Sequence, residues 1–333
     1  MPRLVVSIIN FRTPDLTIAC VSSVLRDLSA TPDARDAEVV IVDNASNDGS
    51  VEHLSDWIDA HPDDPVRLIR SPLNTGFSGG HNQVIESSDT DYVLLLNSDA
   101  ELRVGCLAKL LAAAERDKAA GLIGPALEGE DGTRQTSFFR WPGALSELER
   151  GASLGPVTAL LSRWVVPLGP EPETDEIGWT AFACVLLRRA MIDQIGPLDG
   201  GYFLYFEDVE YCLRAKRAGW TVGHAPAARA LHHIGGSTGV TALQTQHLRR
   251  PAFYYAGRSR YFFQAYGRFG LLAANVGWTI GRALSWTRFL LGKGRPAGTA
   301  HEARDIWINF AQPLGPRHAP PDAEEPPGQR VPT

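Results

Sequence analysis

The chain has 333 residues, of which 44% are hydrophobic and 21% charged, and its formal net charge is -6. This composition is typical of a globular protein with a full hydrophobic core, in one large or two smaller domains. The acidic balance leaves no basic footprint, so we expect no nucleic-acid partner. Cys20, Cys106, Cys184 and Cys212 form no CxxC pair, which argues against a zinc site or a disulfide scaffold and is typical of a reducing compartment.

The N-terminal segment MPRLVVSIINF predicts a strand and not a signal peptide, because no small-residue cleavage site follows it. No run of about 18 uncharged apolar residues occurs, so we expect no membrane-spanning helix. These patterns favour a cytoplasmic protein.

The first half of the chain alternates strand and helix patterns. Near-continuous apolar runs predict strands, and apolar residues three to four positions apart predict the helices between them. The predicted strands are 3–10, 37–46, 66–72 and 91–99, and the predicted helices are 15–28, 48–60, 78–88 and 105–117. This alternation predicts an α/β fold with a mostly parallel central sheet flanked by helices on both faces.

The second half is less regular. Residues 125–178 are rich in Gly, Pro and Glu, and we expect loops there. A strand running into a helix is predicted for 179–196, and an amphipathic helix follows an aromatic run within 204–220. A short strand is predicted at 221–226, a helical region from about 242 to 312, and a disordered Pro-rich tail thereafter.

Polar side chains mark the ends of the predicted strands. Asn10, Asp43 and Asp99 each fall at or just beyond a carboxyl end, where open α/β sheets bind ligands. Each residue alone is equally consistent with a turn or a helix cap. The acidic pair Glu207 and Asp208 is likewise consistent with a helix N-terminus, where acids complement the dipole.

Two further motifs leave alternatives open when they are taken alone. The glycine-rich NTGFSGGHN (74–82) lacks the spacing of a P-loop or a dinucleotide fingerprint, so it is consistent with a flexible connection. The pair His232 and His233 is consistent either with a hydrogen-bonded histidine at a strand end or with a metal ligand.

Taken together, the motifs resemble a known family. IINFR, VDNAS, NTGFSGGHN, LLLNSDAEL, GWTAFACVLLRR, LYFEDVEYCLRAKRAGW and HHIGGS follow the order seen in family 2 glycosyltransferases, across residues 3–265. The resemblance is closest to the rhamnosyltransferase-like branch, which builds bacterial surface polysaccharides. It implies the GT-A fold and an inverting transfer, with a catalytic domain at 1–240, a C-terminal helical region at 241–312 and a tail at 313–333. The nucleotide-sugar half would be 1–100 and the acceptor half 101–240.

The resemblance also implies roles for individual residues. The donor nucleotide sugar would be bound by Asn10, Phe11, Arg12, Asp43, Asn74, Gly76, Phe77, Asn82, Asn97 and Ser98. The NSD segment occupies the place of the family's Asp-x-Asp metal motif, but Asn97 replaces the first Asp, so Asp99 alone would supply the carboxylate. His232, 24 residues after Asp208, would be the second metal ligand, with His233 the less favoured choice.

The expected chemistry agrees with these roles. A divalent cation, Mg²⁺ or Mn²⁺, would offset the charge on a departing diphosphate. An attacking sugar hydroxyl needs a base within hydrogen-bond reach, which we assign to Asp208 with Glu207 second. The aromatic residues Tyr202, Phe203, Tyr205 and Phe206 would wall this base, and Trp179, Thr180 and Tyr205 would face the acceptor.

The C-terminal helical region admits two interpretations. It is either a helical cap with solvated arginines or an interfacial helix on an anionic membrane, with Trp278 and Trp286 at headgroup level. Arg258 and Arg260 could instead contact an acceptor diphosphate.

The expected partners are a nucleotide-diphosphate sugar, with deoxythymidine-diphosphate-rhamnose the first choice, and a glycan or lipid-linked oligosaccharide acceptor. Two alternatives remain. A sugar nucleotidyltransferase would carry a Gly-rich loop with Arg or Lys after the first strand, and NFRTPDLT lacks one. A non-catalytic sugar-nucleotide-binding scaffold is consistent with Asn97.

Overall fold

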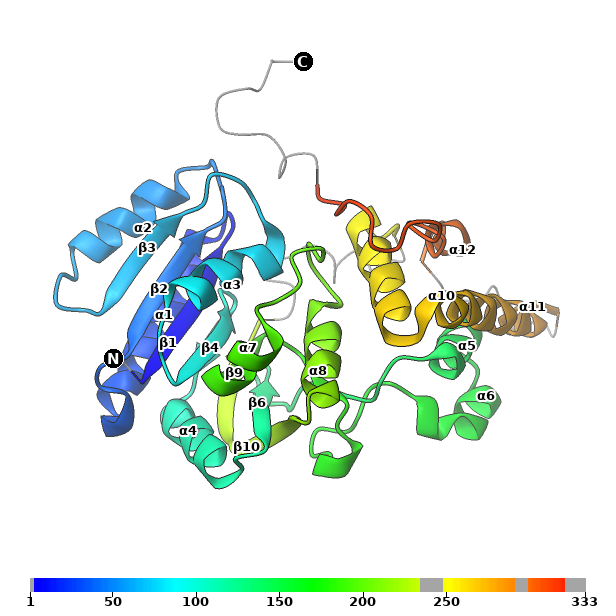
Figure 1. Ribbon diagram of the computed structural model, residues 1–333, viewed down its shortest axis with the longest axis horizontal. Helices are drawn as coiled ribbons and strands as arrows, with labels where there is room; N and C mark the ends of the chain where they lie inside the picture. Colours follow the sequence, from blue (N-terminus) through cyan, green and yellow to red (C-terminus); the bar gives the residue numbers. More distant parts are fainter. Residues whose placement is uncertain (1–2, 234–247, 291–298, 321–333) are drawn as a thin grey trace, which may run out of the picture.

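The computed structural model describes residues 3–233, 248–290 and 299–320 (Figure 1). The predicted disordered tail lies mostly outside these ranges, as does residue 242, where the helical region is predicted to begin. The sheet and its helices form one side of the molecule in Figure 1, and the C-terminal helices lie on the other.

An eight-stranded sheet lies at the centre, in the order β3-β2-β1-β4-β9-β6-β10-β5. Neighbouring strands are parallel from β3 to β4 and between β6 and β10, whereas β9 and β5 run antiparallel to their neighbours. The strands are β1 (Leu4–Asn10), β2 (Glu38–Asp43), β3 (Val66–Arg70), β4 (Tyr92–Asn97), β5 (Ala100–Leu102), β6 (Ala120–Glu128), β9 (Cys184–Arg188) and β10 (Thr221–His232). The predicted mostly parallel sheet is confirmed.

Helices cover both faces of this sheet, as predicted. One face packs against α1 (Pro14–Ser29), α2 (Ser50–Asp59) and α4 (Cys106–Arg116), and the other against α3 (Gly76–Ser87), α7 (Arg189–Ile195) and α8 (Glu207–Arg217). The side chains of β1 show the division, because Leu4, Val6 and Ile8 enter the first layer and Val5 the second. A strand buried on both faces reads as a continuous apolar run, which is why the sequence pattern located it.

The expected loop region at 125–178 is partly regular, which corrects the prediction. β6 continues to Glu128, a small two-stranded sheet pairs β7 (Phe138–Phe139) with β8 (Trp179–Thr180), and α5 (Ala144–Ala152) and α6 (Gly155–Leu160) follow β7. α5 packs on a helix more than a hundred residues later in the chain. Its stability therefore depends on a distant partner that the local sequence pattern does not show.

The C-terminal helical region is confirmed where it is described. It contains α10 (Ala252–Ser285), α11 (Thr287–Leu290) and α12 (Glu302–Asp305). α10 breaks at Gly267, whose φ of 70° and ψ of -173° are not helical. The part before Gly267 packs on α8 and on the loop that precedes it, and the part after it packs on α5.

Glycines let α5 and α10 approach closely. A Cβ atom added to Gly281 would lie 2.0 Å from the Leu148 carbonyl oxygen, and one added to Gly277 would lie 2.5 Å from that of Ala144. On the other helix, a Cβ at Gly151 would lie 2.3 Å from the Trp278 carbonyl oxygen. Any larger residue at these positions must separate the two helix backbones.

A buried ionic cluster fastens the same helices. The guanidinium of Arg258 donates to Glu147 at 2.7 Å and to Asn275 at 2.6 Å, and Arg150 joins Glu147 to Glu302 on α12. Burial alone would raise the pKa of Glu147, but Arg150 and Arg258 outweigh it and lower that pKa to about 2. Because every charge in the cluster has a partner, removing one of them would leave another buried and uncompensated.

Replacing Gly281 with alanine tests the helix contact. We expect Gly281→Ala to lower the free energy of unfolding by about 1–3 kcal/mol, because the new methyl group overpacks the interface. The control is Gly155→Ala on α6, where an added Cβ meets nothing within 4 Å. Urea unfolding of both variants measures the difference, and equal stabilities would contradict the contact.

Candidate active site

The ends of β1 and β2 are joined by a network of buried side chains. The amide of Asn10 donates to Asp43 Oδ1 at 2.7 Å, and its oxygen accepts the hydroxyl of Thr17 at 2.9 Å. Asp43 also accepts the hydroxyl and the backbone N–H of Ser46. Asn10 and Asp43, both predicted donor-binding residues, therefore lie together at the carboxyl edge of the sheet and fix the loops around it.

The two residues that follow β1, Phe11 and Arg12, reach the surface of this edge. Arg12 has a φ of 60°, and its backbone N–H donates to Ser46 Oγ at 3.0 Å. Its guanidinium donates to the Ser46 carbonyl and lies 4.7 Å from the centre of the Phe11 ring. An aromatic face and a cation thus lie side by side at the rim of the network.

The glycine-rich segment is held by Asn44, a residue that the sequence analysis did not single out. The Asn44 amide donates to Asn74 Oδ1 at 2.9 Å and to the Gly76 carbonyl, and its oxygen accepts the Thr75 N–H. Its place beside Asp43 in VDNAS is the signal that could have found it. The segment is therefore held in place where it enters α3 at Gly76, and it is not a flexible connection.

The start of α3 also lies in close contact with the segment that precedes α8. The N–H of Phe77 donates to the Phe203 carbonyl at 2.7 Å, and a Cβ at Gly76 would lie 2.1 Å from that oxygen. Gly76 also has a φ of 71°. From the C-terminal end, Arg317 donates to the Thr75 carbonyl at 2.6 Å and lies over the Phe203 ring.

Asn82 lies at the same contact between α3 and the segment before α8. Its amide donates to the Leu198 carbonyl at 2.8 Å, and its oxygen accepts the Leu198 N–H at 3.0 Å. Both ends of the side chain are engaged by backbone. In this structure the predicted donor-binding residue joins α3 to the segment before α8.

The NSD segment begins at the end of β4. Asn97 is partly exposed, its backbone N–H donates to the Ala183 carbonyl, and the hydroxyl of Ser98 lies 3.3 Å from that of Thr13 on α1. Asp99 is buried. Its Oδ1 atom lies 3.7 Å from His232 Nε2 at the end of β10, so a carboxylate and an imidazole from distant segments face each other.

The environments of the two histidines differ. Burial is the main reason that the pKa of His232 is lowered, and its Nδ1 lies 3.2 Å from Gln135 Oε1. With a proton on Nδ1, the neutral ring directs a lone pair from Nε2 towards Asp99. His233 lies between Glu101 and Glu130, which outweigh burial and raise its pKa. His232 therefore presents Nε2 to Asp99, whereas both ring nitrogens of His233 are engaged by carboxylates.

The start of α8 carries the acidic pair. Tyr205 and Phe206 precede it with φ of 73° and 72°, a costly conformation for residues with a Cβ atom. Burial and the neighbouring Asp208 raise the pKa of Glu207 well above its usual value, and its Oε2 has no hydrogen-bond partner among the described residues. Burial raises the pKa of Asp208 to about 7, although its side chain keeps some access to solvent.

The predicted acceptor residues are placed unequally. Trp179 is partly exposed and stacks on Phe139 with ring centres 4.1 Å apart, and Tyr205 is partly exposed beside Tyr254. Thr180 is buried, and its hydroxyl donates to the Ser137 carbonyl at 3.0 Å. It offers no surface to an acceptor in this conformation.

The aromatic wall around the acidic pair requires a correction. Tyr202 is buried and donates its hydroxyl to Gln264, while Phe203 is buried against Phe253. Both side chains pack under α10 because that helix covers the loop. Tyr205 and Phe206 remain partly exposed.

The suggested acceptor contacts of two arginines are wrong. Arg258 is buried in the ionic cluster with Glu147 and Asn275. Arg260 forms a two-point ion pair with Asp199, at 2.9 and 3.0 Å. Both guanidinium groups are committed to carboxylates inside the protein, so neither is available to a diphosphate.

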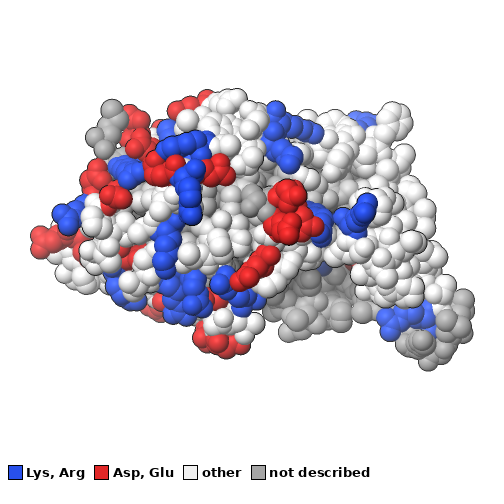
Figure 2. Space-filling view, turned by 90° about the horizontal axis from the view of Figure 1, so that it is seen from below, with Lys and Arg blue, Asp and Glu red and all other residues white. Residues whose placement is uncertain are grey.

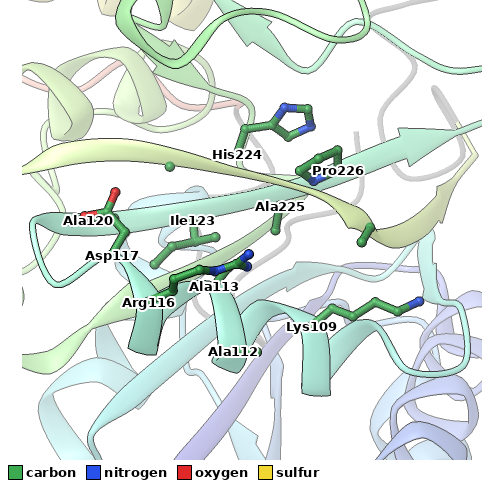
Figure 3. A pocket seen from close by; sticks show the side chains of 12 residues that line it. Lys109, Ala112, Ala113, Arg116, Asp117, Ala120, Ile123, His224, Ala225 and Pro226 are labelled. Carbon is green, nitrogen blue, oxygen red and sulfur yellow. Dashed lines mark hydrogen bonds between the residues drawn. The ribbon is translucent and has the colours of Figure 1, made fainter.

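A cavity of about 340 Å³ lies away from these residues, between α4 and the first part of β10 (Figure 3). Its lining includes Lys109, Arg116 and Ala225, and none of the predicted site residues. His232 lies at the opposite end of β10. Within the described ranges, no group of three or more His, Cys, Asp and Glu side chains gathers to hold a metal.

The sequence and the fold were compared with those of known proteins. The sequence profile of glycosyl transferase family 2 matches residues 5–166, and that of glycosyl transferase family group 2 matches 92–299. An N-acetylglucosaminyl-diphospho-decaprenol L-rhamnosyltransferase of Mycobacterium tuberculosis is 31% identical over 276 residues, 77% of this chain and 84% of the relative. The chain belongs to glycosyl transferase family 2. The predicted resemblance to its rhamnosyltransferase-like branch is confirmed.

The chain is also similar to the low-salt glycan biosynthesis hexosyltransferase Agl10 of Haloferax volcanii. The two sequences are 27% identical over 59% of each chain. Among solved structures, the mannosyltransferase PcManGT of Pyrobaculum calidifontis, in complex with GDP-Man and Mn²⁺, covers 94% of this chain and 85% of its own with a TM-score of 0.51 and 14% identity. TarS of S. aureus (residues 1–349) has a TM-score of 0.52, 14% identity, and coverage of 94% and 81%. These neighbours confirm the GT-A fold.

Replacing Gly76 with alanine tests the loop contact at Phe203. Gly76→Ala introduces both an unfavourable positive φ and a clash with the Phe203 carbonyl oxygen. Gly49→Ala is the matched control, because Gly49 also has a positive φ (90°) but nothing within 4 Å of an added Cβ. We expect Gly76→Ala to lose about 1–3 kcal/mol more unfolding free energy than Gly49→Ala. Equal losses in urea unfolding would show that the Phe203 contact imposes no constraint.

Proposed function

We propose that this family 2 glycosyltransferase transfers a sugar from a nucleotide-diphosphate donor to a hydroxyl of a glycan or lipid-linked acceptor, with inversion at the anomeric carbon. The main support for this proposal comes from Asp208 at the start of α8, because burial raises its pKa to about 7. Rhamnose is the first choice of sugar, because a rhamnosyltransferase is 31% identical over most of the chain.

Asp208 is the proposed base. A general base acts best when its pKa lies near the working pH, because it is then both deprotonated and basic enough to take a proton. The pKa of about 7 gives Asp208 this property. Glu207 is more deeply buried, and burial together with the neighbouring Asp208 raises its pKa well above the usual value, so it is the second choice. One base and one displacement invert the anomeric centre, so no nucleophilic side chain is required.

Asp99 and His232 are the proposed ligands of a divalent cation. Their facing oxygen and nitrogen atoms, and the lowered pKa of His232, fit one carboxylate and one neutral imidazole on the same ion. The carboxylate suits either Mg²⁺ or Mn²⁺, and the imidazole nitrogen favours Mn²⁺ of the two. When bound, the cation would offset negative charge on the leaving diphosphate. Gln135 would hold the tautomer of His232 from the other side of the ring.

The donor nucleotide would lie along the carboxyl ends of β1, β2 and β4. Phe11 and Arg12 at the rim would meet the base and ribose, above the Asn10 and Asp43 network. The loop of Asn74 and Gly76 would border the diphosphate, and Asn97 and Ser98 add no negative charge next to the phosphates. Trp179 and Tyr205 would face the acceptor. We place the reaction at the cytoplasmic face of the membrane, where a lipid-linked acceptor would be presented.

A non-catalytic sugar-nucleotide-binding scaffold is the second candidate. Two observations favour it: Asn97 stands where the family has an Asp, and the described residues form no cluster of three metal-binding side chains. A scaffold would bind the donor but would not catalyse transfer.

The pH dependence tests Asp208. A base whose pKa is raised to about 7 is protonated below that pH, so kcat/KM for transfer should rise with pH up to about 7 and then level off. Asp208→Asn should lower kcat by about 10²–10⁴-fold while donor binding in a thermal-shift assay is kept. Asp193→Asn on the exposed surface of α7 is the control. Full activity in Asp208→Asn would exclude it as the base.

Metal titration separates the two histidines. With a fixed concentration of nucleoside diphosphate, His232→Gln should raise the Mn²⁺ concentration at half-maximal thermal shift by about 10- to 100-fold. His233→Gln should have a much smaller effect, because its ring is engaged by Glu101 and Glu130. The assignment is wrong if both variants titrate like the unsubstituted protein, or if His233→Gln has the larger effect.

A further inference from the structure

The part of α10 after Gly267 exposes a continuous apolar stripe. Its members are spaced three or four residues apart, as one face of a helix requires. They are Phe269, Leu272, Val276, Ile280 and Leu284, with exposed fractions from 39% to 87%. Apart from Arg268 at its start, the other exposed positions of the same stretch, Ala273, Thr279 and Ala283, are also uncharged.

The opposite face of this helix is fully used inside the protein. Gly277 and Gly281 contact the backbone of α5, and Trp278 is buried. This corrects the expectation that Trp278 lies at headgroup level, whereas Trp286 is 44% exposed at the end of the stripe. Rotation of the helix therefore cannot hide the stripe, and none of the residues that the structure describes covers it.

The charges around the stripe point to an anionic partner. The chain is acidic as a whole, yet it contains no Asp or Glu between Glu210 and Glu302. Arg268 and Arg288 are exposed at the two ends of the helical stretch. In the face shown by Figure 2, acidic residues gather on the left and in the centre, while the right-hand end is mainly uncharged with some Lys and Arg.

The helix α6 lies at the same end of the molecule as this part of α10 (Figure 1). Leu160 at the end of α6 is 79% exposed, and Trp164 just after it is 44% exposed. Exposed Trp and Leu beside Arg are typical of helices that lie at the boundary between headgroups and acyl chains. Within the described ranges, no helix has the length and hydropathy needed to cross a bilayer.

We propose that the stripe of α10 lies in the interface of an anionic lipid bilayer, with Trp286, Arg268 and Arg288 at headgroup level. The apolar side chains would insert below the headgroups, and the arginines would attract the negative surface. This occupant is favoured over a second copy of the chain because the surrounding segment is basic and entirely free of acids, which gives a copy of itself no opposite charge to meet.

Docking would also orient the candidate site. The first part of α10, before Gly267, touches the loop that leads into α8: a Cβ at Gly257 would lie 2.9 Å from the Tyr205 carbonyl oxygen, and Tyr254 packs on Phe206. The exposed part of α10 and the part that contacts the loop before Asp208 therefore belong to one helix, on either side of Gly267. The consequence for a lipid-linked acceptor rests on the proposed function, but the docking itself does not.

Vesicle cosedimentation of the full-length protein tests this surface. The probes are phosphatidylcholine vesicles with and without phosphatidylglycerol, which contain no acceptor lipid. We expect binding to the anionic vesicles that weakens with salt and without phosphatidylglycerol. The double variant Val276→Asp and Ile280→Asp places two charges in the stripe at exposed positions and should lower the partition coefficient by about tenfold or more.

A matched control separates position from net charge. Val104→Asp with Ala112→Asp adds the same two charges at exposed positions around α4, and should bind the vesicles like the unsubstituted protein. Absence of binding by the unsubstituted protein, or equal binding by both double variants, would overturn the proposal. So would a change from dimer to monomer in light scattering with vesicle binding unchanged, because the stripe would then be a self-association surface.

A thermal shift with nucleoside diphosphate keeps the two proposals apart. The stripe variants should retain the donor shift, because the stripe contacts none of the donor residues. Vesicle binding without any donor shift in the unsubstituted protein would leave the docking surface in place and reject the proposed function.

Discussion

A close backbone contact between the start of α3 and the segment before α8, supported by the Asn82–Leu198 hydrogen bonds, joins the two halves of the candidate site. The Phe203 carbonyl accepts the N–H of Phe77 at 2.7 Å, and the absence of a side chain at Gly76 makes this approach feasible. Asn44 shapes the loop from the donor side, and α10 covers the Phe203 segment from the other. The glycine-rich segment and the start of α8 are therefore held against each other, and under the proposed function this would lower the entropy cost of bringing donor and base together.

Burial shifts the pKa values of Asp208 and His232 in opposite directions, and in both residues it favours the uncharged form. It raises the pKa of Asp208 and lowers that of His232, so that both groups are largely uncharged or only half charged near neutral pH. Both pKa shifts agree with the roles proposed for these residues, a general base for Asp208 and a metal ligand for His232. The same burial lowers the stability of the folded state as pH rises from the ordinary Asp pKa of 3.8 towards about 7, because the unfolded chain releases the Asp208 proton over that range while the folded protein keeps it.

Much of this organisation could be predicted from the sequence. Apolar runs located β1, β2 and β4, and the polar residues that end them, Asn10, Asp43 and Asp99, were placed at one edge because parallel strands share that edge. Asn82, Thr180, Arg258 and Arg260 were harder, because an amide, a hydroxyl or a guanidinium has the same chemistry whether it meets a ligand or the protein's own backbone and carboxylates. α5 was missed because its partner lies on α10, and only the glycine spacing of Gly277 and Gly281 hints at that contact.

The central claim is that the carboxyl edge of the sheet binds a nucleoside diphosphate with a divalent cation. The most direct measurement is a thermal-shift panel of dTDP, UDP and GDP, each with Mn²⁺, Mg²⁺ or a chelator, on the full-length protein. Ligands that bind only the folded state raise its melting temperature. We predict a shift with one nucleotide that requires the metal and is lost in Asp99→Ala. No shift with any nucleotide under any metal condition would contradict the account.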